Sequence, residues 1–351
     1  MTENTAISTY DSPFAKYQSK VAAYLEQKKP SIPGGENPAF ISVTPLAQGE
    51  YNINYLLSGP TSKAVFRINI ASQINRADQI LYEYKALQLL RHSGVTPQPY
   101  HVDDSKELID KGILIMEYLP GRMLDYTTDI AAAAKVFSTI HQVQVAPEDN
   151  HLIREEQPLT LIFDECSGLL EDYFKASIAD PEIVSLLKDI LAWAKENKTK
   201  ETYYQDAPYQ CIVNTEVNSG NFIVSPANNT TYLIDWEMPR WGDPSSDLCH
   251  FISPLTTLWK TDYRIDAAAT ELFLNTYKQH MQSQPLKDTL DERMRLKMPY
   301  VLLRGISWSA MAWVAYQQDF AGVRNEQTWK TLTRYMDASF IRSLFDPFIR
   351  S

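Results

Sequence analysis

The amino-acid sequence predicts an α+β protein of two lobes: a small β-rich N-terminal lobe and a larger, mainly helical C-terminal lobe. Three observations support this class. Short runs of β-type composition fill residues 41–70. A further apolar run then ends at Pro120-Gly121, which is turn chemistry. Beyond it, most of the chain has apolar residues three and four positions apart, as in helices. We place the lobes at residues 1–118 and 119–351.

The N-terminal lobe is expected to open with an amphipathic helix over residues 17–27. Three β runs follow, with turn chemistry between them at Gly49 and at residues 58–60: ISVTPL, NINYLL and AVFRINI. Apolar spacing then predicts a helix over residues 79–92, which Gly94 and Pro97 would end. The lobe closes on a strand over residues 112–118.

The C-terminal lobe is expected to be helical with one β interruption. Helical spacing predicts these segments: 130–143, 161–176, 181–197, 266–282 and 302–317. The interruption covers residues 212–233 and carries polar residues within apolar runs. The late aromatic residues Trp308, Trp313 and Tyr316 are interpreted as core packing, because positions five apart do not share one helix face.

Bulk properties narrow the class of partner. A chain of 351 residues is long enough for two domains. The formal charge of −10 argues against nucleic acid as the main partner, since phosphate binding needs clustered Lys and Arg. Three widely spaced cysteines match no zinc or disulfide pattern, and no signal peptide or membrane span is evident. We expect a cytoplasmic monomer or homodimer without a membrane partner.

The most informative segment is a polar loop between two apolar runs. The run 211–213 leads into a loop that carries Glu216 and Asn221, and the run 222–224 follows. A third apolar run delivers Asp235, fourteen residues after Asn221. Such a hairpin would place Asn221 and Asp235 at the same end of adjacent strands.

This spacing has the chemistry that phosphoryl transfer needs. An amide oxygen and a carboxylate form a hard-oxygen site suited to Mg²⁺, which completes its shell with water and substrate phosphates. Glu216, five residues before Asn221, is placed to reach an incoming hydroxyl group. The three residues therefore form a candidate catalytic set, with Asn221 and Asp235 as metal ligands. The alternative is a solvated Asn-Gly turn between strands.

The loop resembles the HGDLxxxN catalytic loop of aminoglycoside phosphotransferases and choline kinases, which share the protein-kinase fold. Here the pattern is carried by residues 214–222, and the metal-binding aspartate of that family corresponds to Asp235 in IDWE. The later family pattern GDPxxDLA matches residues 242–249. The resemblance implies that Asp247 supports the loop, and His141 is interpreted as a structural histidine.

The N-terminal half resembles the same family in order. Gly49 would lie in the nucleotide-covering loop, and Arg67 would neutralise ATP phosphates. Glu83 would pair with that cation, although an Arg–Glu pair can equally be a solvated surface pair. The backbone of Glu117 to Leu119 would face adenine. The resemblance implies an ATP-dependent and Mg²⁺-dependent kinase acting on a small-molecule hydroxyl, of the aminoglycoside, choline or thiamine-like class.

Two departures from the family pattern affect this expectation. Glu216 replaces the catalytic aspartate, and Asn214 replaces the preceding histidine. The extra methylene displaces the carboxylate by about 1.5 Å, and a misplacement of about 1 Å can cost on the order of a hundredfold in rate. The alternatives are a slow or altered kinase, a kinase adapted to an unusual acceptor, and a nucleotide-binding pseudokinase.

Overall fold

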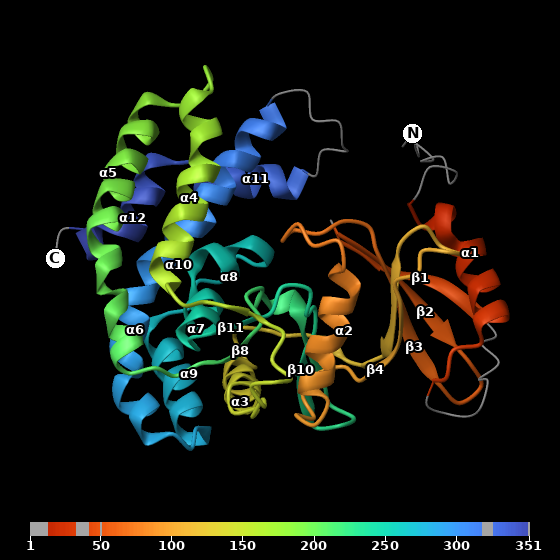
Figure 1. Cartoon of the computed structure of the whole chain (residues 1–351). Helices are drawn as coiled ribbons and strands as arrows, with labels where there is room; N and C mark the ends of the chain where they lie inside the picture. Colours follow the sequence, from red (N-terminus) through yellow and green to blue (C-terminus); the bar gives the residue numbers. More distant parts are fainter. Residues whose placement is uncertain (1–12, 33–41, 50, 318–325, 350–351) are drawn as a thin grey trace. The chain divides into compact units, whose positions relative to one another are not determined.

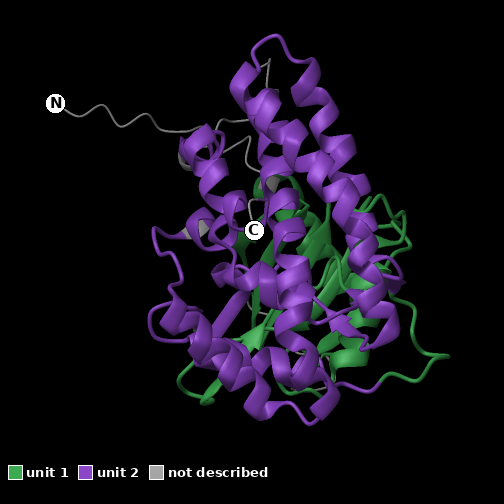
Figure 2. Cartoon of the chain, turned by 90° about the vertical axis from the view of Figure 1, so that its left-hand side faces the viewer, with its two compact units in different colours: residues 1–121, 145–152, 225–239 green, residues 122–144, 153–224, 240–351 purple. Residues whose placement is uncertain are grey.

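The computed structural model describes residues 13–32, 42–49, 51–317 and 326–349. These residues group into two compact units (Figure 2), and Figure 1 labels their helices and strands. Unit 1 comprises residues 1–121, 145–152 and 225–239, and unit 2 comprises residues 122–144, 153–224 and 240–351. Unit 1 is therefore assembled from three stretches of chain. The assignment of nucleotide and acceptor roles to residues 1–118 and 119–351 stays a prediction.

Unit 1 is built on a five-stranded antiparallel sheet with the order β1-β2-β3-β5-β4. Its elements in chain order are α1 (Pro13–Lys28), β1 (Ser42–Gln48), β2 (Asn52–Ser58), β3 (Lys63–Asn69), α2 (Gln79–Leu90), β4 (Pro99–Asp103), β5 (Gly112–Glu117) and β10 (Thr230–Leu233). Helix α1 packs on the apolar core of this unit through Tyr17, Val21 and Tyr24, which recur at helical spacing. The expected helix at 17–27 is thus confirmed and begins four residues earlier.

The two faces of β2 and β3 differ in chemistry because side chains alternate along a strand. Ile53 and Tyr55 of β2 belong to the core with Phe66 of β3. The residues between them point to the opposite face, where Asn52 pairs with Asn69 and Asn54 pairs with Arg67 across the strands. One face of this ribbon is therefore apolar, and the other is polar towards its Asn52–Asn69 end, although Leu56 pairs with Val65 further along it.

Unit 2 is mainly helical. Its helices are α3 (Ile130–Ile140), α4 (Pro158–Lys175), α5 (Pro181–Asn197), α6 (Thr202–Asp206), α7 (Ser245–Ile252), α8 (Pro254–Lys260), α9 (Ala267–His280), α10 (Gln284–Gln317), α11 (Glu326–Tyr335) and α12 (Ala338–Ile349). Short strands are β6 (Arg122–Met123), β7 (Ile153–Arg154), β8 (Cys211–Val213), β9 (Phe222–Ser225) and β11 (Arg240–Gly242). The core joins residues of α4, α5, α10 and α12.

Several elements differ from the sequence prediction. Helix α10 runs for 34 residues and includes Pro299, whereas the sequence predicted a helix only over 302–317. Strand β4 and helices α7, α8, α11 and α12 were not predicted. A proline removes one hydrogen bond from a helix, and Leu296 and Tyr300 on either side of Pro299 pack in the core of unit 2.

The late aromatic residues are partly buried and pack on other aromatic rings, and Trp313 packs against the apolar core of unit 2. Trp308 lies edge-on to Trp259 with ring centroids 5.3 Å apart, and Trp313 lies 6.1 Å from Tyr173. Tyr316 stacks on another indole ring of unit 2. Among the described residues, no helix is long and apolar enough to cross a membrane.

Candidate functional site

The polar face of unit 1 holds an arginine with three side-chain partners. Arg67 Nη1 binds Glu83 Oε1 at 2.5 Å and Asp235 Oδ1 at 2.9 Å. Its Nε donates to Asn54 Oδ1 at 3.0 Å. The Arg67 and Glu83 side chains are only 6% and 1% exposed, so the alternative of a solvated surface pair is wrong.

Burial and charge act against each other in this cluster. Burial raises the pKa of Glu83 to about 7, although the Arg67 guanidinium opposes the rise. For Arg67, burial lowers the pKa, but three neighbouring carboxylates outweigh it and raise the value overall. Glu83 Oε2 is buried and has no hydrogen-bond partner within the described chain. Burying an ionised carboxylate with one unsatisfied oxygen costs free energy, which favours the protonated form and therefore agrees with the raised pKa.

The segment that follows β10 carries Asp235 into the cluster. Asp235 has φ +65°, in the left-handed region. Glu237 Oε2 accepts a hydrogen bond from Asn52 Nδ2 at 2.5 Å, and the Glu237 carbonyl accepts one from Gln79 Nε2 at 2.6 Å. The Pro239 carbonyl accepts one from the Tyr82 hydroxyl at 2.5 Å.

The donor set of this cluster fits a divalent cation. One guanidinium, that of Arg67, faces the carboxylates of Glu83, Asp235 and Glu237, so negative charge is in excess when all are ionised. Asp235 is more exposed than Arg67 and Glu83, with 27% of its side chain accessible. Carboxylate oxygens at a partly open position are the ligands that Mg²⁺ prefers.

In unit 2 the loop over residues 214–221 is held by Asp247 from α7. Asp247 Oδ2 accepts the Asn214 amide and Oδ1 accepts the Thr215 amide, both at 2.8 Å. Asp247 Oδ2 also lies 3.3 Å from His141 Nε2, whose other ring nitrogen lies 3.0 Å from the Tyr277 hydroxyl. These contacts are buried, so the supporting role expected for Asp247 and the structural role expected for His141 agree with the geometry.

The two candidate residues of this loop are tied to each other through the backbone. The Glu216 amide donates to Asn214 Oδ1 at 3.0 Å, and the Glu216 carbonyl accepts from Asn221 Nδ2 at 2.7 Å. That bond uses the amide nitrogen of Asn221, so its side-chain oxygen is the atom with which it would bind a cation. Asn218 caps the following turn by accepting the Gly220 amide at 2.9 Å.

The family model of the phosphotransferase enzyme family, abbreviated APH, matches residues 42–285. This stretch is more than half of the 351 residues and contains both the Arg67 cluster and the 214–221 loop. The chain belongs to the phosphotransferase enzyme family. No curated protein sequence matches it.

Solved structures with kinase-like folds resemble this phosphotransferase-family chain. A choline kinase from Cryptosporidium parvum Iowa II has a TM-score of 0.64 and 16% identity over 94% of this chain and 97% of that one. An ethanolamine kinase from Plasmodium vivax has a TM-score of 0.63 and 13% identity, over 96% of this chain and 91% of that one. A spectinomycin phosphotransferase, solved with ADP and spectinomycin, has a TM-score of 0.57 and 14% identity, over 87% of this chain and 92% of that one. The predicted fold class, protein-kinase-like α+β, is confirmed.

Of the residues predicted for this phosphotransferase-family chain, Arg67, Glu83 and Asp235 meet in unit 1. Glu216 and Asn221 lie together in unit 2. The predicted joining of Asn221 and Asp235 at one metal ion relates one unit to the other and remains a prediction.

The predicted nucleotide-covering turn and adenine-facing strand end also lie in unit 1. The Gly49 amide donates to the Asn52 carbonyl at 2.9 Å, and a Cβ at Gly49 would meet nothing closer than 4.0 Å. The Glu117 amide donates to the Gln98 carbonyl at 2.8 Å. The Glu117 carboxylate accepts the Gln98 amide at 3.1 Å, and Leu119 follows beyond the end of β5. Their contact with nucleotide remains a prediction.

Sequence reasoning missed a group of charged residues near the 214–221 loop. Arg304 of α10 is 28% exposed, and its Nε binds Glu165 Oε1 of α4 at 3.1 Å. Burial lowers the pKa of Arg304, but Glu165 and Glu216 outweigh it and raise the value overall. Burial and Arg304 together lower the pKa of His250 to about 4, against Asp247 and a hydrogen bond to the Thr215 backbone. Only three-dimensional packing brings these residues near Glu216.

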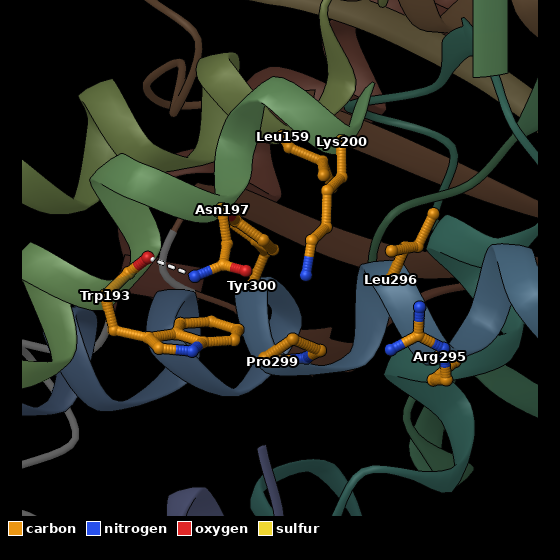
Figure 3. A pocket seen from close by; sticks show the side chains of 8 residues that line it. All are labelled: Leu159, Trp193, Asn197, Lys200, Arg295, Leu296, Pro299 and Tyr300. Atoms are coloured by element: carbon orange, nitrogen blue, oxygen red, sulfur yellow. Dashed lines mark hydrogen bonds between the residues drawn. The ribbon is translucent and has the colours of Figure 1, made fainter. Parts of the chain in front are cut away.

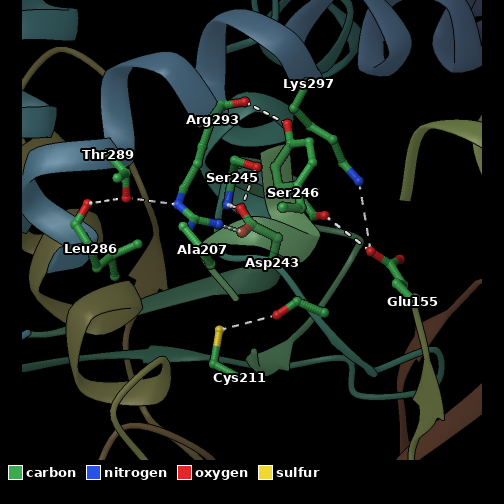
Figure 4. A network of polar contacts seen from close by, with 12 residues as sticks. Glu155, Ala207, Cys211, Asp243, Ser245, Ser246, Leu286, Thr289, Arg293 and Lys297 are labelled. Carbon is green, nitrogen blue, oxygen red and sulfur yellow. Dashed lines mark hydrogen bonds and ion pairs between the residues drawn. The ribbon is translucent and has the colours of Figure 1, made fainter. Parts of the chain in front are cut away.

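A buried network of polar contacts includes the first two residues of α7, Ser245 and Ser246 (Figure 4). Arg293 of α10 binds Asp243 and the Ala207 carbonyl, and Asp243 Oδ1 accepts the amide and hydroxyl of Ser245 at 2.9 and 2.6 Å. Glu155 lies 3.7 Å from Lys297 in the same network. Because its members neutralise and hydrogen-bond one another, the network braces the start of α7, the helix that carries Asp247.

A separate hollow on unit 2 is lined by Leu159, Trp193, Asn197, Lys200, Arg295, Leu296, Pro299 and Tyr300 (Figure 3). Its empty volume is about 260 Å³, including open solvent. Arg295 is already paired with Glu292 at 2.6 Å, and none of the predicted site residues lines the hollow.

Proposed function

We propose that this protein is an ATP-dependent phosphotransferase that moves the γ-phosphoryl group of ATP to a hydroxyl group of a small molecule. Family membership supports phosphotransferase chemistry. The observation that carries the proposal is the buried Arg67, bonded at once to Glu83 and Asp235. Phosphoryl transfer depends mainly on positioning and on charge at the phosphates, and such a cation with a fixed partner supplies both.

The candidate residues would divide between binding the phosphates, holding the metal ion and activating the acceptor. Arg67 would bind ATP phosphates and Glu83 would hold Arg67 in place. Asp235 and Asn221 would hold Mg²⁺, which when bound would neutralise charge on the phosphates. Glu216 would orient the acceptor hydroxyl and take its proton as the oxygen forms its bond to phosphorus. The bond from that phosphorus to the ADP oxygen breaks in the same transfer.

The turn at Gly49 and the end of β5 would contribute backbone groups rather than side chains. The Gly49 turn would cover the phosphates, where a residue without Cβ allows close approach. The Glu117 carbonyl and the Leu119 backbone would face adenine. We expect a cytoplasmic monomer or homodimer that binds neither nucleic acid nor membrane.

The acceptor class is proposed from the relatives and from charge. The names of the similar structures include choline kinase, ethanolamine kinase and spectinomycin phosphotransferase, whose named acceptors are choline, ethanolamine and spectinomycin. A formal charge of −10 favours a cationic or neutral acceptor over an anionic one. We propose an acceptor that carries a hydroxyl group and an amine or quaternary ammonium, of the aminoglycoside, choline or thiamine-like class.

The direct test is acceptor-stimulated ATP consumption across a panel of amino alcohols, sugars, aminoglycosides and thiamine-like compounds. We expect Asp235→Ala to lower turnover by at least about a hundredfold, the upper end of losses measured for the outer-shell partners of metals. Asp110→Ala removes an exposed carboxylate of unit 1 and serves as the matched control. ATP consumption that no acceptor in the panel stimulates would contradict the proposal.

A nucleotide-binding pseudokinase is the second candidate, and the loop itself favours it. Thr215 has φ +73°, a strained value for a β-branched residue, and the next residue is Glu216 in place of the family aspartate. Glu216→Asp separates the two candidates. If it creates turnover where the wild type only binds ATP, the protein is a pseudokinase. If it lowers existing turnover while Glu196→Asp, an exposed control, changes nothing, Glu216 is the working base.

A further inference from the structure

The segment around Asp235 forms hydrogen bonds, both before and after Asp235, with residues that lie far away in sequence. Asn52 of β2 binds the Glu237 carboxylate, 185 positions later, and Gln79 of α2 binds the Glu237 carbonyl, 158 positions later. Before Asp235, the Leu233 carbonyl accepts the Trp236 indole N–H at 2.9 Å, and the Leu233 amide donates to the Val95 carbonyl at 2.9 Å.

These contacts matter because Asp235 holds an unfavourable backbone conformation. A residue with a Cβ at φ +65° is stable only where its surroundings determine the conformation. Asn52, Gln79 and Glu237 are all buried, so water does not replace these hydrogen bonds. The Asp235 carboxylate is held by its ion pair with Arg67 and by the turn at residue 235, whose following segment the two amide side chains bind.

Both amides are engaged at both ends. Gln79 Oε1 accepts from the Ser72 hydroxyl at 2.6 Å while its Nε2 donates to the Glu237 carbonyl. Asn52 Oδ1 accepts from Asn69 Nδ2 at 3.1 Å while its Nδ2 donates to the Glu237 carboxylate. Its own carbonyl accepts the Gly49 amide of the predicted nucleotide-covering turn. One residue thus joins that turn to the segment that carries the predicted metal ligand.

We propose that Asn52 and Gln79 are positioning residues for cation binding by Asp235, acting through the side chain and the carbonyl of Glu237. This rests on the proposed function, in which Asp235 holds the cation. Neither amide touches the cation in this proposal. Their role is to maintain the left-handed turn at Asp235, so that its carboxylate is presented before nucleotide and metal arrive.

The test measures Mn²⁺ binding to the full chain in the presence of ADP by electron paramagnetic resonance, which needs no turnover. We expect Asn52→Ala and Gln79→Ala each to weaken Mn²⁺ binding by about tenfold or more, the range seen for outer-shell partners of metals. Gln18→Ala removes an exposed amide that binds the Val43 carbonyl in the same unit, and it should leave Mn²⁺ binding unchanged. Circular dichroism checks that each variant is folded.

A role swap separates positioning from simple loss of structure. Asn52→Asp alone sets a second carboxylate against Glu237 and should weaken Mn²⁺ binding further than Asn52→Ala. Asn52→Asp combined with Glu237→Gln restores one donor and one acceptor with the roles exchanged. We expect this double variant to recover Mn²⁺ binding to within about threefold of wild type, well inside the tenfold loss.

Two results would overturn the inference. One is Mn²⁺ binding by folded Asn52→Ala and Gln79→Ala that equals the wild type. The other is a double variant that fails to recover, which would mean that the Glu237 carboxylate binds the cation itself. A wild-type protein that binds no Mn²⁺ with ADP would instead refute the proposed function, so the two failures are distinguishable.

Discussion

Thr215 illustrates how a single residue can carry backbone strain at a candidate site. Its φ of +73° crowds the branched side chain against the backbone. The Asp247 carboxylate accepts its amide, and this buried contact helps to hold the conformation. The family motif HGDLxxxN has a glycine at this position, and glycine adopts positive φ without steric cost. The strain is therefore specific to the side chain present here.

This strain predicts that Gly and Ala rank in opposite order for stability at position 215 and at an ordinary helix position. At position 215 we expect Gly to give a higher free energy of unfolding than Ala, by about 1 kcal/mol, because Ala keeps the left-handed cost. At Thr333, on the exposed side of helix α11, Ala should exceed Gly by about 1 kcal/mol. Urea denaturation of the four variants measures both differences. Equal stability of Gly and Ala at position 215 would show that the strain is absent.

At the residue scale, the sequence predicted the charged members of the site better than the neutral ones. Arg67, Glu83 and Asp235 lie in an ordered series of motifs, and the structure brings these three together. Asn52 and Gln79 gave no signal, because an amide in a strand or helix is common and its partner lies more than 150 positions away. Partners fixed by tertiary packing leave no local pattern.

At the scale of elements, the 214–221 loop depends on helix α7 for both its hydrogen bonds and its electrostatics. Asp247 accepts two loop amides. His250, one turn later on the same helix, supports the Thr215 carbonyl. A protonated His250 would place positive charge beside Arg304, so the helix and the loop pack best with a neutral imidazole.

This environment predicts a loss of stability in mild acid. The pKa of His250 is lowered from 6.5 to about 4 in the folded state by burial and Arg304. Between these values the unfolded chain binds a proton that the folded chain does not, so stability falls as the pH drops from 6.5 to 4. The His250 contribution to the loss is about 3 kcal/mol.

The measurement is urea denaturation at several pH values, comparing wild type with His250→Gln. The substitution should flatten the fall between pH 6.5 and 4. His92→Gln, at an exposed position, is the control and should follow the wild type. Identical pH profiles for wild type and His250→Gln would contradict the prediction.

Element boundaries followed local signals where these were strong. Helix α5 has the predicted bounds, 181–197, because Asp180 caps it and a proline occupies its first turn. Helix α10 was underestimated, since its first half is rich in charged residues and Pro299 indicated a break. Strand β4 was missed because its short sequence, PYHVD, begins with proline and has few apolar residues. Long-range packing determines these elements, and it has no counterpart in a local window.

For the molecule as a whole, the proposed nucleotide site predicts stabilisation by ligand. A ligand that binds only the folded state at a hundred times its Kd adds about 2.7 kcal/mol. We expect ADP with Mg²⁺ to raise the Tm of the wild type in thermal denaturation, and Asp235→Ala to lose most of that rise. ADP with a chelator should give a smaller rise. An equal rise with and without the metal would exclude a cation from the binding reaction.

The three-segment composition of unit 1 has a consequence for how the protein is made. The ribosome synthesises Arg67 and Glu83 long before Asp235, which lies 152 residues after Glu83. At typical elongation rates this delay is about 8–30 s. During that time Arg67 lacks one of its two carboxylates, and Asn52 and Gln79 lack the segment that they hold. Until then, the N-terminal sheet lacks the contacts that residues 225–239 supply to its polar face. A fragment that stops at residue 121 would never form these contacts.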